Sequence, residues 1–260
     1  MRVVSVHRDA VVATSRLWQL NAVALRSGDE GMLIDSPYFP DELELLPGLL
    51  DQAGFRVDAL LATHADFDHV LGRLAFPDLS LGVAESTMLR IRAEPGAVQR
   101  ELRDSDAELY VERERPLSLG QVQSLPVPGR VELGNEHQLE LHPSDGHTAD
   151  GMAVFAPWCG VLVCGDYLSP LEIPMVSEGG SLAGYRSTLG ALAGLIDQAE
   201  TIVPGHGAPQ ERDAALRILD EDVDYLEALE RGGERPALPE GRDTRAQREL
   251  HAANLSRLRP

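Results

Sequence analysis

Short apolar and β-branched runs alternate with charged or glycine-containing turns through the first third of the chain, a pattern typical of sequential β-strands. It predicts strands at Val3–Val6, Ala10–Thr14, Ala22–Arg26 and Met32–Ile34, and then at Val57–Ala62 and Leu81–Val83. Between these strands, helical periodicity predicts a helix over Pro40–Ala53, weakened at Pro47, and a short helix over Val70–Ala75.

The middle of the chain is charged and helical in period, and strand signals then return. The periodicity of Glu85–Arg115 predicts helix interrupted at Pro95-Gly96. The pattern of Leu117–Arg130 predicts a loop or an edge strand. Further strands are expected at Val131–Leu133, Gln138–Leu141, Met152–Phe155, Val161–Val163 and Thr201–Val203. Helices are expected at Ser181–Ala199, Gln210–Leu229 and Thr244–Leu258, with a loop through Gly232-Gly233 and Pro236–Gly241 between the last two.

The strand-rich blocks fall into two sets, each ending in helices. This arrangement indicates an α/β fold with two sheets packed face to face and helices outside, although other α/β layouts fit the same periodicity. The sequence contains neither a repeat of fixed period nor a low-complexity tract. We therefore expect one domain over residues 1–260, with a helical cover around 85–130 and C-terminal helices over 210–258.

The net charge of the chain limits the classes of partner that it is expected to bind. The 260 residues include 42 acidic and 23 basic side chains, for a net charge of -19, and every basic residue is arginine. The absence of lysine excludes Schiff-base chemistry and a phosphate loop with its usual lysine. The acidity argues against nucleic acid or an anionic membrane surface as the main partner, because both require a basic footprint. A small-molecule substrate is the partner that remains.

Two cysteines, Cys159 and Cys164, are too few for a disulfide framework, and Cys164 lies in an apolar run that predicts a buried thiol. The N-terminus lacks the basic, apolar and small-residue order of a signal peptide. The longest apolar region, Gly151–Gly165, is broken by Pro157 and is too short to span a bilayer. These features predict a soluble, cytoplasmic protein.

The residues most suggestive of chemistry form the cluster Thr63-His64-Ala65-Asp66-Phe67-Asp68-His69, directly after a predicted strand. A strand end fixes the position of the loop that it presents to solvent, which favours functional sites there. One aspartate would suffice to cap the following helix, so two histidines and a second aspartate would remain unexplained. The cluster therefore predicts a metal site.

Three other strand ends carry isolated polar residues next to glycine. His147 lies in Asp145-Gly146-His147-Thr148, Asp166 follows Cys164-Gly165, and His206 lies in Pro204-Gly205-His206-Gly207. Any one of them is explained as a turn residue. Their repeated context at four strand ends indicates instead that they belong to one site.

With these motifs, the sequence resembles the metallo-β-lactamase superfamily over nearly its whole length. The family pattern is a His-x-His-x-Asp-His loop followed by Gly-His-Thr, by Gly-Asp after a strand, and by Pro-Gly-His-Gly; Asn21 and the Ile34-Asp35 pair match its opening strands. The resemblance implies a four-layer αββα sandwich and two divalent metal ions. It places His64, Asp66 and His147 on one ion and Asp68, His69 and His206 on the other, with Asp166 as the bridge.

The main departure from the family pattern is Asp66, which stands where the family has histidine. Zinc accepts nitrogen and oxygen ligands, but the additional carboxylate shifts the expected preference toward iron or manganese. Asp35 is expected to orient a metal-bound imidazole, unless it only caps a turn. Asp145 and Asp150 either orient His147 or form turns, and turn formation is the more frequent role. His7, His137, His142 and His251 are expected to lie outside the ligand set.

The implied activity is that of a metal-dependent hydrolase that activates water, with Asp68 and Asp166 as catalytic residues. The resemblance points to an ester, thioester or lactone, as in the glyoxalase II-like and lactonase branches. A mononuclear non-haem iron oxidoreductase similar to the persulfide dioxygenases is an alternative. A phosphodiesterase is a second one, disfavoured by the acidity, and a non-catalytic metal- or ligand-binding member is a third.

The charged segment Glu85–Arg130 is expected to cover the site, and its cationic and phenolic side chains have two interpretations. They either meet an anionic substrate or pair with neighbouring glutamates on a solvated helix face. These side chains are Arg90, Arg92, Arg100, Arg103, Tyr110, Arg113 and Arg115.

Overall fold

The computed structural model of the chain describes residues 1–231 and 238–258, so most of the loop predicted at Gly232-Gly233 and Pro236–Gly241 lies outside the described residues. Within the described part, one sheet has seven strands in chain order. They are β1 (Arg2–His7), β2 (Ala10–Thr14), β3 (Asn21–Ser27), β4 (Glu30–Ile34), β5 (Ala59–Leu61), β6 (Leu81–Ala84) and β7 (Val122–Leu125). Strands β1 to β4 pair antiparallel, and β4 to β7 pair parallel.

A second sheet of six strands, again among the described residues, comes from the later part of the chain. In spatial order its strands are β13 (Gln210–Glu211), β12 (Thr201–Val203), β11 (Val161–Val163), β10 (Met152–Ala156), β9 (His137–Pro143) and β8 (Gly129–Leu133). Strands β11 and β12 are parallel, and the other neighbours are antiparallel.

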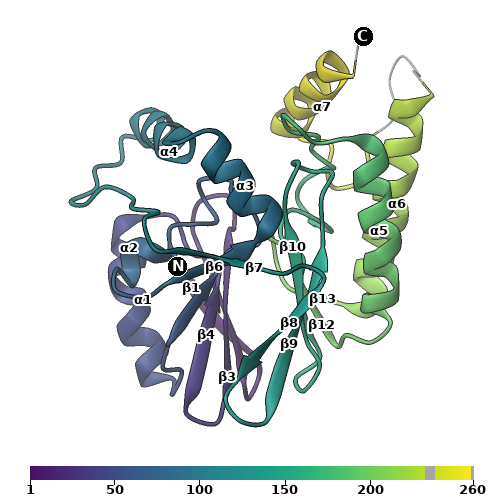
Figure 1. Ribbon diagram of the computed structural model, residues 1–260. Helices are drawn as coiled ribbons and strands as arrows, with labels where there is room; N and C mark the ends of the chain where they lie inside the picture. The colour runs from purple at the N-terminus through teal and green to yellow at the C-terminus, as the bar shows by residue number, and fades with distance from the viewer. Residues whose placement is uncertain (232–237, 259–260) are drawn as a thin grey trace.

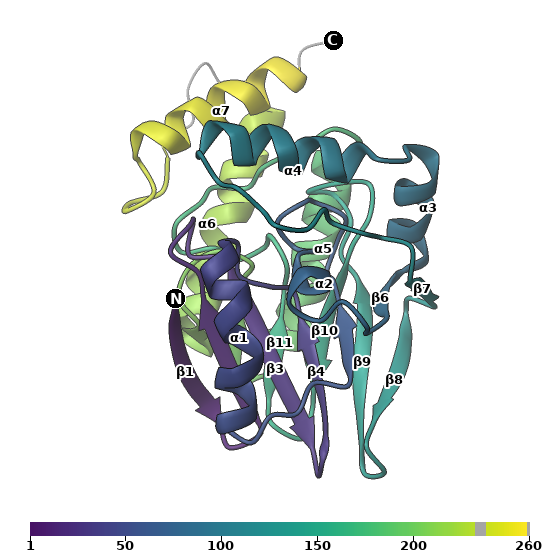
Figure 2. The same cartoon turned by 90° about the vertical axis from the view of Figure 1, so that its left-hand side faces the viewer.

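Helices cover the outer faces of the two sheets and one end of the sandwich (Figure 1). Helices α1 (Pro40–Gln52) and α2 (Gly72–Ala75) lie on the first sheet, and α5 (Leu182–Ile196) and α6 (Arg212–Glu230) lie on the second. Figure 2 shows α4 (Ala97–Glu108) and α7 (Arg245–Arg257) above the strands, with α3 (Glu85–Ala93) beside them. The layers are helix, sheet, sheet and helix, which confirms the predicted αββα sandwich.

The core follows from the two-residue period of the strands, whose successive side chains point to opposite faces. On β2, Ala10 and Val12 pack in the layer between the sheets, together with Val154 of the second sheet. Val11 and Ala13 of the same strand pack under the outer helices. The layer between the sheets is continuous and apolar. It supports the expectation of one domain, which stays a prediction.

The strand directions bring six loops to one end of the sandwich. The carboxyl ends of β4 and β5 meet there because these strands are parallel, and those of β11 and β12 meet for the same reason. The loops that lead into β3 and β10 turn back at this end, since each of these strands is antiparallel to such a neighbour. Ligand sites of α/β sheets commonly form outside the carboxyl ends of strands.

Most of the predicted elements are present, with a few shifted boundaries. Helix α1 continues through Pro47, and the break between α3 and α4 falls at the predicted Pro95-Gly96. Strand β13 occupies the first two residues of the helix predicted from Gln210, so α6 begins at Arg212. Cys164 is buried as predicted. No helix in residues 1–231 and 238–258 combines the length and hydrophobicity that crossing a bilayer requires.

Candidate metal centre

The polar loop after β5 is tied to both sheets by hydrogen bonds of the Thr63 backbone. The Thr63 N–H donates to Asp35 Oδ1 at 2.8 Å, and Asp35 directly follows β4 of the first sheet. The Met152 N–H at the start of β10 donates to the Thr63 carbonyl oxygen, also at 2.8 Å. The loop therefore begins at a fixed point between the sheets, with His64 and His69 buried.

The seven residues proposed as ligands converge from four loops at this end. Their ligand atoms form three groups in which all atoms lie within 4.8 Å of one another. These groups are His64 with Asp66 and His147, His64 with His69 and Asp166, and Asp68 with His69 and His206. The first and third groups have the composition of the two metal sites that the resemblance implies.

Asp166 lies between the two histidine pairs and directs a different oxygen at each. Its Oδ2 is 3.3 Å from His147 Nε2 and 3.7 Å from His64 Nε2. Its Oδ1 is 3.1 Å from His69 Nε2 and 3.4 Å from His206 Nε2. One carboxylate thus faces both groups, which is the geometry that a bridging ligand requires.

The spacing of the donor atoms fits metal ions. Two ligands each about 2.1 Å from one tetrahedral ion lie about 3.4 Å apart. Asp66 Oδ2 is 3.6 Å from His64 Nε2 and 3.4 Å from His147 Nε2. Asp68 Oδ2 is 3.9 Å from His69 Nε2 and 3.5 Å from His206 Nε2. The donor spacing within each of the two groups therefore suits a divalent metal ion.

Four buried polar atoms in the centre lack hydrogen-bond partners among the described residues. They are His64 Nε2, His69 Nε2, His147 Nε2 and Asp166 Oδ1. An unpartnered buried polar group costs about 1 to 3 kcal/mol, and native proteins rarely leave several together. Because all four face the same space, metal coordination accounts for them as a set.

The imidazoles are held by their second nitrogens, which leaves Nε2 to face the centre. His69 Nδ1 lies 2.9 Å from Asp35 Oδ2, as expected of an orienting carboxylate. His147 Nδ1 donates to the Met175 carbonyl at 2.8 Å, and His206 Nδ1 donates to the Trp18 carbonyl at 3.3 Å. Asp35 is in the left-handed region with φ of 56°, a strained conformation maintained by these contacts.

The loop that carries His206 is fixed by Asn21 and by the small size of Gly205. The Asn21 amide donates to the carbonyl oxygens of Pro204 and Gly207 at 2.8 and 2.7 Å, on either side of His206. A Cβ at Gly205 would collide with Asp166 Oδ1, so only glycine lets this loop approach the carboxylate.

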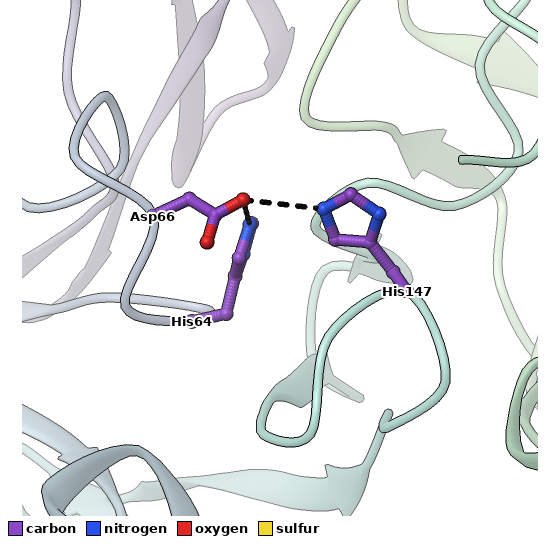
Figure 3. Close-up of side chains that lie close together, drawn as sticks. All are labelled: His64, Asp66 and His147. Atoms are coloured by element: carbon purple, nitrogen blue, oxygen red, sulfur yellow. Dashed lines mark ion pairs between the residues drawn. The ribbon is translucent and has the colours of Figure 1, made fainter. Parts of the chain in front are cut away.

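Asp66 reaches the centre directly, although its side chain is shorter than the histidine of the family pattern. Figure 3 shows its Oδ2 turned toward both His64 and His147. The sequence leaves open whether the loop draws closer or a water fills the gap. In the structure Asp66 Oδ2 lies 3.6 Å from His64 Nε2 and 3.4 Å from His147 Nε2, close to the distances of Asp166 Oδ2 from the same two atoms.

The carboxylates and imidazoles of the centre shift one another's pKa values. Burial lowers the pKa of His147, but the nearby carboxylates of Asp66 and Asp166 outweigh burial and raise it to about 9. Burial likewise lowers the pKa of His206, and Asp166 overcomes it and raises the pKa to about 10. Burial raises the pKa of Asp166, yet His69, His206 and His64 bring it well below the ordinary value.

Metal loading is therefore expected to release protons at neutral pH. His147 and His206 are protonated in the metal-free chain below pKa values of about 9 and 10, whereas metal ligation requires neutral imidazole. Metal affinity should rise as pH increases toward these values. The same raised pKa values stabilise the metal-free fold below about pH 6.5, and this contribution is lost as pH rises through 9 and 10.

The measurement is a zinc titration in weak buffer at pH 7.5 with a pH indicator. His142→Ala, at an imidazole outside the three groups, should release as many protons as the wild-type chain. Loading without proton release would contradict the protonation assigned to His147 and His206.

An exposed aromatic surface adjoins the His206 side of the centre. Trp18 is 45% exposed, and its ring centroid lies 6.4 Å from those of both His206 and Phe67. Trp18 and Gln19 have φ of 51° and 50°, and the Gly207 N–H holds the Gln19 carbonyl oxygen at 3.0 Å. A strained turn anchored to a ligand loop thus presents Trp18 beside the centre.

The other residues singled out in the sequence either lie outside the metal centre or have partners that the sequence did not predict. His7, His137, His142 and His251 belong to none of the metal-holding groups found among the described residues. Arg90, one of the side chains considered for contact with an anionic substrate, forms ion pairs with Asp66 and Asp150. Turn formation is not the role of the Asp150 side chain, since its Oδ2 accepts the Ala65 N–H at 3.0 Å. Arg113 pairs with Asp106.

Comparison with known proteins agrees with this geometry. Residues 16–206 match the family described as the metallo-beta-lactamase superfamily. A metallo-beta-lactamase from Pontibacter korlensis superposes with a TM-score of 0.62 at 18% identity, covering 87% of this chain and 98% of that one. A metallo-beta-lactamase family protein from Thermus thermophilus gives 0.65 at 20% identity, covering 87% and 82%. These structures share the fold. No curated protein matches the chain.

Proposed function

We propose that this chain, which belongs to the metallo-beta-lactamase superfamily, is a metal-dependent hydrolase with a two-ion centre. The observation that carries the proposal is Asp166, whose two oxygens face two separate histidine pairs at 3.1 to 3.7 Å. A carboxylate shared in this way supports two adjacent ions. It favours a two-ion centre over the single ion of an oxygenase site.

The ligand roles follow from the groups. His64, Asp66 and His147 would hold one ion, Asp68, His69 and His206 the other, and Asp166 both. Bound divalent ions act as Lewis acids and lower the pKa of water to about 7, which is the chemistry of hydrolysis at neutral pH. Asp68, as one of the proposed catalytic carboxylates, would also orient the attacking water.

The proposed substrate class is an ester, thioester or lactone. The absence of lysine leaves a phosphate-bearing substrate without one of its usual cationic partners. The aromatic surface of Trp18 and Phe67 beside His206 suits an apolar acyl group, because an exposed ring buries apolar area when such a group binds. Three carboxylates among seven ligands favour manganese or iron alongside zinc.

Trp18→Ala is expected to raise KM about 10-fold with kcat and metal content nearly unchanged. The substitution removes apolar contact area worth about 1 to 3 kcal/mol in binding but no ligand of the centre. Steady-state kinetics with substrates of increasing acyl length would measure this, because the loss should grow with the acyl chain. Leu45→Ala, at an exposed apolar residue of α1, is the control. A KM independent of Trp18 would remove this surface from the substrate site.

The proposed function is tested by metal analysis combined with a substrate panel. Purified chain is stripped of metal, reloaded separately with zinc, manganese and iron, and assayed on thioesters, lactones, carboxylic esters and phosphodiesters. We expect about two ions per chain and turnover of an acyl substrate. One ion with oxygen consumption would support the iron oxidoreductase alternative, and two ions without turnover of any substrate would support a binding role.

A further inference from the structure

The guanidinium of Arg90, on α3, lies between two aspartates that come from different loops. Its NH2 is 2.7 Å from Asp66 Oδ1, and its NH1 is 2.8 Å from Asp150 Oδ1. Only 30% of the Arg90 side chain is exposed, and the Asp150 side chain is fully buried. Both amino groups are therefore engaged within the protein rather than directed at solvent.

Because of the contact with Arg90, the two carboxylate oxygens of Asp66 have different partners. Oδ1 accepts the ion pair from Arg90, and this leaves Oδ2 turned toward His64 and His147. Asp150 completes a closed ring of contacts with Arg90 and the loop. Its other oxygen accepts the N–H of Ala65, the residue before Asp66. The ring fixes both the backbone and the carboxylate of this part of the loop.

Charge gives a second reason for the arrangement. A carboxylate in place of a neutral imidazole adds one negative charge to a centre that already contains Asp68 and Asp166. Arg90 supplies one positive charge in direct contact with the added carboxylate. Its planar fork spans two carboxylates in a fixed direction, which the single ammonium of a lysine does not reproduce.

We propose that Arg90 is the positioning residue that makes Asp66 a metal ligand in place of the family's histidine. It holds Oδ1, keeps Oδ2 aimed at the ion shared with His64 and His147, and offsets the added charge. Arg90 thus acts on the metal through Asp66 and not on the substrate. The inference rests on the proposed metal centre, and its test measures metal binding without any assay of hydrolysis.

The experiment titrates metal-free chain with Mn²⁺ and follows the free ion by its electron paramagnetic resonance signal. For Arg90→Gln we expect one of the two ions to bind about 10- to 100-fold more weakly, the loss typical when a partner that orients a ligand is removed. Arg90→Lys should recover part of the affinity. Arg92→Gln, at an exposed arginine on the same helix, should bind as the wild-type chain does.

A double-mutant cycle separates positioning from general support of the loop. If Arg90 acts through Asp66, adding Arg90→Gln to Asp66→His should leave Mn²⁺ affinity nearly unchanged. An equal loss in both backgrounds would assign Arg90 to the loop through Asp150 and overturn the proposal. Wild-type affinity in Arg90→Gln would also overturn it. Wild-type chain that binds no metal would instead overturn the metal centre itself, and with it the proposed function.

Discussion

Asp166→Ala is expected to empty both metal positions and to reduce hydrolysis more than 100-fold, beyond the loss caused by removing an orienting partner. The reason is geometric, since the two oxygens of Asp166 serve different histidine pairs. Without the carboxylate, each pair loses a negatively charged ligand, and the four imidazoles must hold two cations with only Asp66 and Asp68. Elemental analysis after dialysis against dilute metal should fall from about two ions per chain to well below one.

The matched control is His251→Ala, which removes an imidazole that contacts Tyr225 on α6 at 3.0 Å and belongs to none of the three metal-holding groups. Its metal content should equal that of the wild-type chain. Thermal unfolding of the metal-free variants separates loss of ligation from loss of fold. Should Asp166→Ala keep as much metal as His251→Ala, the shared-carboxylate assignment would be wrong.

The proposed ligands stand out in the sequence because they lie in short polar loops that follow strands. His64, Asp166 and His206 come within a few residues of apolar runs whose ends the parallel strands β5, β11 and β12 bring together. The position of such a residue depends on the local strand and on the order of strands in the sheets. Both are encoded by short-range patterns, so the sequence alone could propose these residues as one set.

The contacts around the ligands were harder to foresee because they join segments far apart in the chain. Helical periodicity in Glu85–Ala93 predicts a helix, but not which ligand Arg90 meets once that helix packs over the loops. Asp150 resembles a turn residue until its partners on two other elements are known. The left-handed turn at Trp18 was equally hidden, since no glycine marks it.

The short strand β13 illustrates the same limit in the fold. Its two residues, Gln210 and Glu211, are polar and directly precede the amphipathic run of α6, so the sequence pattern assigns them to the start of the helix. They form a strand because Thr201 and Ile202 of β12 offer open backbone groups for pairing. Tertiary pairing overrides local propensity most easily in elements this short.

Asp66→His is expected to shift metal preference from manganese or iron toward zinc and to move the acidic limb of the pH–activity profile to lower pH. Imidazole is a softer donor than carboxylate, which favours zinc. It is also neutral, so the centre becomes one unit more positive, and a more positive centre lowers the pKa of the water that it activates. Competitive loading with equal zinc and manganese, followed by elemental analysis, measures the first effect, and kcat/KM from pH 5 to 10 measures the second.

Asp78→His is the appropriate control because it makes the same change in net charge at an exposed position outside the centre. Its metal preference and pH profile should match those of the wild-type chain. Asp66 Oδ2 lies 3.4 Å from His147 Nε2, the separation expected of two ligands of one ion. Replacing this oxygen should therefore change the donor atoms and the charge around the ion. If preference and profile both stayed as in the wild-type chain, Asp66 would not touch the metal, and a water between them would have to take its place.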